Sequence, residues 1–272
     1  MDGEGFDRSG GAGANGSVNV TEPGLQEWAG EPVPAWRDAP PDPFAPIDPN
    51  APVSGHSVPS ETERPAPAVA PEHDWSAAVE RIYPLLRPVG TQGLAAASLD
   101  AAALAATAAH GHAQPIVDEG PCSLAVVYAI AASGFDVIVN GDHLLSWGVG
   151  IEAVQDAALR NLAAWSATAA WAEETSGDRR LISSDTGDGW DAARILLPEV
   201  RDHLARELGG SGRVLVGLPD RYLLLAGALR PEDAEFGVLF HDFVVEHSGG
   251  SDEPVDRRVF EIVDRQLVEF VG

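Results

Sequence analysis

The chain has 272 residues, of which 44% are hydrophobic, so it is long enough for one or two domains with a sizeable core. Its formal net charge is −25, and all 17 basic residues are arginine. A chain this acidic repels the phosphate backbone, so we expect no binding to nucleic acid. Cys122 is the only cysteine, which excludes an intrachain disulfide and a cysteine-rich zinc site.

The first residues contain neither the basic region nor the apolar region of a secretory signal peptide. No apolar run reaches the roughly 18–20 residues that a membrane-spanning helix needs. We therefore expect a cytoplasmic protein that does not bind membranes.

Residues 1–74 differ in composition from the rest of the chain. They hold 13 of the 21 prolines, and 13 acidic residues against three arginines. Such a segment buries too little apolar surface to offset its ordering entropy, so we predict a disordered acidic tail before a single globular domain over residues 75–272. Trp28, Trp36 and Phe44 interrupt this tail, and acidic segments with aromatic residues can dock into a partner protein. A simple spacer is the alternative.

The predicted domain begins with helices. Apolar spacing over residues 75–86 predicts a helix that Pro84 kinks or ends. Ser98 is expected to cap an alanine-rich helix that reaches about Ala109. His110 and His112 follow, but no carboxylate cluster with ligand spacing lies nearby, so we predict no metal site.

The central part of the chain combines a hairpin with the longest helical pattern. Two apolar runs, residues 124–130 and 135–139, flank turn-forming residues and predict an antiparallel pair. Residues 146–165 then carry an apolar stripe at steps of three and four, which is typical of a core helix. Trp165 is expected to be the largest contributor to that stripe.

A polar stretch to about residue 189 is predicted to be a solvated loop, with Asp188 or Asp191 capping the short helix that follows. Pro198 suits the first turn of another helix. Two further hairpins are predicted, residues 213–218 with 222–226 and residues 258–263 with 266–271. Between them lies a helix with the predicted inner face Phe236, Leu239, Phe240, Phe243 and His247.

Helices alternate with hairpins along the whole domain. Hairpins imply antiparallel pairing, and helices between them cover a sheet. The predicted fold is therefore α+β, with a largely antiparallel sheet of three hairpins and helices packed mainly on one face.

Three segments carry a resemblance to a known family. They include Trp147-Gly-Val149 with Asn161-Leu162, then Asp188-Gly-Trp-Asp191, and finally residues 216–224, which read V-G-L-P-D-R-Y-L-L. In this order and spacing the chain resembles the YtpQ-like family of uncharacterised bacterial proteins, most clearly over residues 124–225. The resemblance implies a related fold and brings no activity or cofactor with it.

Six residues of these segments are candidates for binding a ligand or partner: Trp147, Asn161, Asp191, Arg194, Asp220 and Arg221. Each also has a structural interpretation. Trp147 would close the helix entry as part of a hydrophobic staple, and Asn161 would bind a neighbouring backbone group. Asp191 and Arg194 have the spacing of an ion pair on a helix, and the last two residues suit a hairpin turn.

The functional interpretation is that Arg194 and Arg221 converge as a clamp for an anionic ligand or acidic peptide. The sequence lacks a nucleophile elbow, a phosphate loop and zinc-protease spacing, which favours a non-catalytic interaction or regulatory module. The alternative is a hydrolase for an anionic substrate, with Asp185, Asp188 or Asp191 as the base and one of the two arginines as electrostatic stabiliser. A structural subunit is a third possibility and requires a large exposed apolar patch.

Overall fold

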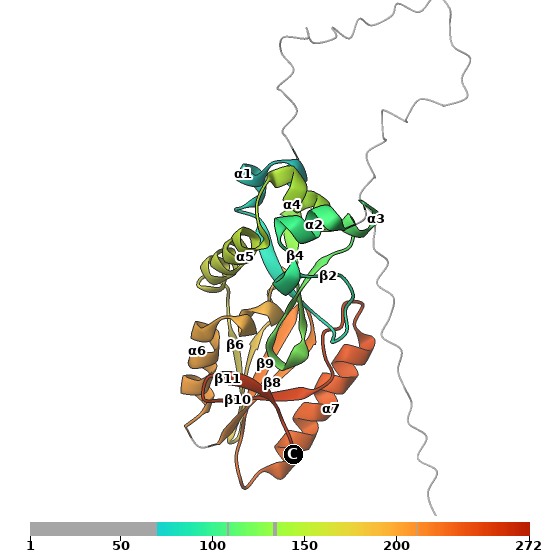
Figure 1. The fold of residues 1–272 in the computed structure, drawn as a ribbon. Coiled ribbons are helices and arrows are strands. Elements are labelled where there is room, and N and C mark those ends of the chain that lie inside the picture. The colour runs from blue at the N-terminus through green and yellow to red at the C-terminus, as the bar shows by residue number, and fades with distance from the viewer. Residues whose placement is uncertain (1–69, 108, 133–134, 211) are drawn as a thin grey trace, which may run out of the picture. The chain divides into compact units, whose positions relative to one another are not determined.

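The computed structural model describes residues 70–107, 109–132, 135–210 and 212–272, which belong to one compact unit (Figure 1). The predicted acidic tail, with Trp28, Trp36 and Phe44, lies almost entirely outside the described residues. The α+β class and the antiparallel hairpins are confirmed, and the strands are divided between two sheets.

In the described part of the chain the first sheet has five strands: β1 (Ile82–Arg87), β2 (Leu94–Ala95), β3 (Ile116–Glu119), β4 (Ala125–Ala132) and β5 (Phe135–Ile138). The long apolar strand β4 pairs antiparallel with β1, β3 and β5, whereas β2 and β3 run parallel. The predicted hairpin of residues 124–139 is therefore confirmed. Because β4 is buried along most of its length, its near-continuous apolar sequence is explained.

Short helices and turns surround this sheet: η2 (Pro71–His73), α1 (Trp75–Ala78), η3 (Ala96–Ser98), α2 (Ala101–Ala106), α3 (Ala109–His112) and η4 (Pro121–Ser123). The helix predicted over residues 75–86 is wrong beyond Ala78, because Pro84 lies inside β1. Strand β1 pairs only with β4, and an edge strand tolerates a residue without an N–H group. Asp100, rather than Ser98, caps α2 by accepting a hydrogen bond from the Ala103 N–H group.

The longest helical pattern forms two helices, α4 (Gly141–Trp147) and α5 (Ile151–Ser166). Gly148 ends α4 with a φ of +67°, a conformation that glycine adopts without a steric penalty. Trp147 therefore lies at the end of α4, and the prediction that it closes the entry of one continuous helix is wrong.

The stripe of α5 is confirmed by its burial, with one exception. Ile151, Val154, Ala158 and Leu162 are buried in the main core. Trp165 is only partly buried, and its indole N–H donates to Asp188 at 3.0 Å. It is therefore not the fully buried anchor that its size suggested.

The second sheet of the described residues has six strands: β6 (Ala172–Ser176), β7 (Arg179–Ser184), β8 (Arg213–Asp220), β9 (Leu223–Leu229), β10 (Val259–Val263) and β11 (Gln266–Glu269). The order is β11-β10-β8-β9-β7-β6, and all neighbours are antiparallel. The two later predicted hairpins are confirmed. The solvated loop predicted before residue 189 is wrong, because β6 and β7 form a hairpin there. Every residue of β6 is exposed, so this edge strand has no apolar pattern from which the sequence could predict it.

Helices cover both faces of the second sheet (Figure 1). On one face η5 (Ala192–Leu196) and α6 (Pro198–Leu208) contribute to the main core, which also takes in the first sheet and α5. On the other face α7 (Ala234–Gly250) forms a separate small core, in which Phe236, Phe240 and Val244 pack on Leu215 and Leu225.

The predicted inner face of α7 is only partly right. Phe236 and Phe240 are buried, but Leu239 is 49% exposed and Phe243 is 45% exposed. The buried stripe continues instead through Val244 and Ser248, at uniform steps of four. The helix therefore also has apolar residues on its outer side.

Asn161 attaches α5 to the chain that enters β1, so we predict a loss of stability on its removal. Its side-chain amide donates to the carbonyl oxygens of Val79 at 2.8 Å and Ile82 at 2.9 Å. Asn161→Ala should lower the free energy of unfolding by about 1–3 kcal/mol, because two carbonyls lose their donor. Urea denaturation is the measurement, and Arg160→Ala, an exposed change on the same helix, is the control. Equal denaturation midpoints for the two variants would show that these bonds contribute nothing.

Candidate functional site

Asp191 and Arg194 lie in the same buried polar cluster and contact each other through a serine. The Ser184 hydroxyl donates to Asp191 Oδ1 at 2.5 Å and accepts from Arg194 Nη1 at 2.6 Å. Asp191 also accepts from the backbone and the side chain of Thr186, so both of its oxygens are occupied. The sequence spacing of Asp191 and Arg194 suggested a direct ion pair, but in the structure the Ser184 hydroxyl lies between the two charged groups.

Arg194 is 1% exposed, and neutral groups account for its hydrogen bonds. Its guanidinium donates to the hydroxyl and carbonyl oxygens of Ser166, to the Ala170 carbonyl and to Ser184. The Trp171 ring centroid lies 3.7 Å from its guanidinium carbon, close enough for a cation–π contact. Burial lowers the pKa of the Arg194 guanidinium to about 10, and the negative charge of Asp191 opposes that shift.

Arg221 lies between the two sheets and binds carboxylates from both sides. It donates to Asp136 of β5 at 2.5 Å, and to Glu253, in the segment before β10, at 3.3 Å. Arg87 of β1 contacts the same Glu253 carboxylate at 2.5 Å. Burial acts to lower the pKa of Arg221, but the hydrogen bond and charge of Asp136, together with the charge of Glu253, raise that pKa above its usual value.

Arg194 and Arg221 share no acceptor among the described residues. Each guanidinium donates to its own set of internal groups. The first lies against Trp171, and the second lies 5.4 Å from the ring centroid of Trp190. The structure therefore accounts for the burial of both arginines without a ligand between them.

The remaining predicted residues occupy separate places. Trp147 stacks on His143 with ring centroids 5.2 Å apart, and its buried indole N–H has no partner among the described residues. Asn161 binds backbone carbonyls, as its structural interpretation expected. Asp185 and Asp188 are exposed, and no group of three or more His, Cys, Asp or Glu residues able to hold a metal occurs in the described ranges.

The single thiol is held in a structural contact. Cys122 has a φ of +54°, is partly buried, and donates to the Leu267 carbonyl at 3.2 Å. Burial raises the pKa of this thiol, although Arg258 acts in the opposite direction. A thiol with a raised pKa forms less thiolate, which is the nucleophilic species.

Asp220 forms a pair with a histidine that the sequence did not connect to it. Asp220 lies at the irregular end of β8 and accepts from the Tyr222 backbone at 2.8 Å and from His247 Nε2 at 3.0 Å. A carboxylate accepts hydrogen bonds only, so it selects the histidine tautomer that carries a proton on Nε2. The sequence offered no signal for this pair, because 27 positions separate the two residues.

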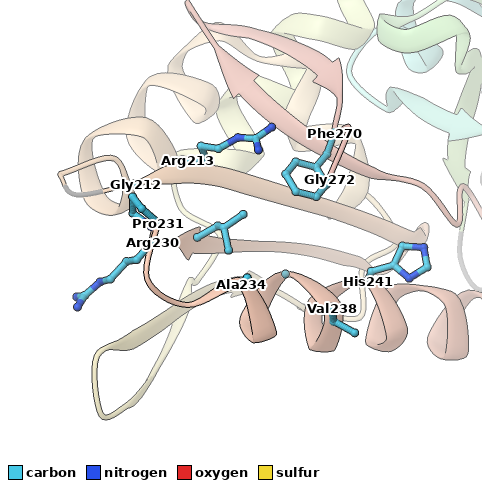
Figure 2. Close-up of a pocket in the computed structure, with 11 residues that line it drawn as sticks. Gly212, Arg213, Arg230, Pro231, Ala234, Val238, His241, Phe270 and Gly272 are labelled. Carbon is cyan, nitrogen blue, oxygen red and sulfur yellow. The ribbon is translucent and has the colours of Figure 1, made fainter.

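Two pockets lie beside α7, and the sequence analysis missed both. The larger, here called the Phe270 pocket, encloses about 740 Å³ between α7, the adjoining ends of β8 and β9, and the chain end after β11. Figure 2 shows Ala234, Val238 and His241 along the helix, with Phe270 and Arg213 on the opposite side. The Arg213 guanidinium carbon lies 4.4 Å from the Phe270 ring centroid, and two nitrogens of the same guanidinium donate to Glu261.

The smaller, here called the His247 pocket, encloses about 540 Å³ on the other side of α7, against β6, β7 and β9. Its apolar wall includes Leu223, Leu225 and Phe243, and His247 also lines it. The one sequence signal for this region was the set of apolar residues of α7 that lie outside its buried stripe. The sequence analysis assigned these residues to the inner face of the helix.

Comparison with protein-family models found no matching family, and comparisons with curated proteins and with solved structures found no similar protein. Among the described residues no helix has the length and apolar character required to cross a membrane.

Replacing Arg194 by lysine tests its buried bonds. Arg194→Lys keeps the charge but offers three donors from one atom, so it cannot reproduce a planar set of bonds to Ser166, Ala170 and Ser184. We expect the free energy of unfolding to fall by about 2–4 kcal/mol in urea denaturation. The exposed change Arg206→Lys is the control. A loss no greater than that of the control would mean that the bonds are not needed.

Glu253 predicts a pH dependence. Burial raises its pKa, but Arg87 and Arg221 act more strongly together and hold it below the usual value of 4.5. A depressed pKa stabilises the fold above pH 4.5, and this contribution is lost as the pH falls through the lower folded value. Glu253→Gln should therefore be less stable than the native chain at about pH 7, with the difference shrinking toward about pH 4 in thermal melts. Glu232→Gln, at an exposed position, should show no such convergence.

Proposed function

We propose that the chain is a non-catalytic interaction or regulatory module of the cytoplasm that binds a largely apolar ligand in the Phe270 pocket. The observation that carries the proposal is the pocket itself, whose volume of about 740 Å³ falls within the range of small-molecule sites. Leu229, Val238 and Phe270 supply apolar walls, as expected for a site that gains affinity by removing apolar surface from water.

The position of the pocket supports a binding role. Six strands spaced about 4.8 Å apart span roughly 24 Å, whereas one helix is about 10–12 Å wide. In the part of the chain that the structure describes, the single helix α7 therefore leaves both flanks of its sheet face uncovered. The Phe270 pocket occupies one flank, and exposed Val238 extends its apolar surface outward.

The alternative, a hydrolase with an Asp/Arg site, has less support. A general base needs an oxygen that is free to take a proton from the reacting group. Both oxygens of Asp191 already accept internal hydrogen bonds, and Arg194 donates to neutral groups that surround it.

The other elements of the proposal come from the sequence. The acidic tail, with Trp28, Trp36 and Phe44, would act as a tether or dock onto a protein partner. The net charge of −25 disfavours nucleic acid as that partner. From the sequence resemblance we also propose that the chain is related to the YtpQ-like family, which brings no activity with it.

Filling the Phe270 pocket tests the proposal. Gly237 lines the pocket, and a Cβ atom added there would lie 3.6 Å from Leu229, an ordinary contact, so Gly237→Leu adds a side chain at the pocket wall without a clash at its Cβ atom. The probe is 8-anilinonaphthalene-1-sulfonate, an aromatic anion that fluoresces in apolar sites. We expect it to bind the native chain, to raise the melting temperature because it binds the folded state, and to bind Gly237→Leu at least about tenfold more weakly.

Gly249→Leu is the matched control, because it makes the same change on the same helix where no atom lies within 4 Å. It should leave probe affinity unchanged. Equal affinity for both variants, or fluorescence without a rise in melting temperature, would contradict a ligand site in this pocket.

A further inference from the structure

The His247 pocket combines an apolar wall with a partly exposed histidine side chain. His247 lies near the end of α7, with its side chain 43% exposed and its ring stacked on Phe243 at 5.5 Å between centroids. The buried carboxylate of Asp220 holds Nε2, so the neutral ring presents Nδ1 as an unprotonated acceptor. No hydrogen bond to Nδ1 occurs among the described residues.

The charged groups of the pocket favour a cation. Glu174 and Asp185 line it, and neither forms an ion pair or a side-chain hydrogen bond with another described residue. The one arginine of its lining, Arg179, is already bound by Asp233 through two nitrogens and by Glu235. The negative charges of the wall are therefore not neutralised, whereas the positive charge is.

We infer that the His247 pocket binds an apolar amine, whose hydrocarbon or aromatic part packs on Phe243, Leu223 and Leu225. Its ammonium group donates to His247 Nδ1 and is attracted by the carboxylates of Glu174 and Asp185. The aromatic rings of α7 add favourable contacts to a cation near their faces. This site is separate from the Phe270 pocket and does not depend on the function proposed above.

Three probes of one shape test the charge preference: 3-phenylpropylamine, the neutral 3-phenylpropan-1-ol and the anion 3-phenylpropionate. Titration calorimetry of the full chain at about pH 8, above the range in which an ordinary imidazole titrates, is the measurement. We expect the amine to bind at least about tenfold more tightly than the anion, with the alcohol between them. Equal affinities, or tighter binding of the anion, would overturn the inference.

Two substitutions locate the site. His247→Lys keeps a partner for Asp220 but replaces the acceptor with a cation, so amine affinity should fall at least about tenfold and anion affinity should rise. Asp185→Asn removes one carboxylate at an exposed position and should weaken the amine about threefold or more.

Matched changes outside the pocket are the controls. His110→Lys and Asp242→Asn alter the same residue types at exposed positions that do not line it. Both should leave the ratio of amine to anion affinity unchanged. If they shift that ratio as much as the pocket variants do, the preference reflects only the overall charge of the chain, and the site is excluded.

Discussion

The structure depends on a buried guanidinium between its two sheets. Removing the charge of Arg221 from water is costly unless carboxylates are placed beside it, and these come from β5 and from the segment before β10. Glu253 then binds Arg87 of β1, so three distant parts of the chain are fixed by one network. Trp190 lies near the Arg221 guanidinium, and its ring stacks on the ring of Tyr83 in β1 with 4.5 Å between the ring centroids. Polar and apolar contacts thus hold the sheets together at one place.

The packing on the two faces of the second sheet determines which surfaces remain open. The second sheet uses one face for the main core that it shares with α5, α6 and the first sheet. Within the described ranges the opposite face has only α7, whose small core occupies the middle strands. A helix is too narrow to cover six strands, so a pocket is left on each flank. The two pockets in which we propose binding are therefore consequences of an unequal distribution of helices over the two faces.

The residue types that suggested chemistry serve mainly to satisfy buried polar groups. Asp191, Ser184 and Arg194 bind one another, and Arg194 also closes the end of α5 through Ser166. The exception is Asp220, whose partner His247 faces a pocket that the internal contacts leave open. A buried carboxylate that orients a partly exposed imidazole is an arrangement suited to binding, whereas a saturated network is suited to holding a fold.

The sequence by itself determined the α+β class, the hairpins with apolar or turn-forming patterns, and the buried stripe of α5, because these depend on local periodicity. It failed where local patterns mislead. Pro84 lies in an edge strand, Gly148 divides a helical pattern, and β6 is exposed throughout. Only the tertiary structure decided that Arg221 joins two sheets and that Asp220 meets His247, since these contacts link residues far apart in the chain. Pockets have the same origin, because they are the space that packed elements leave between them.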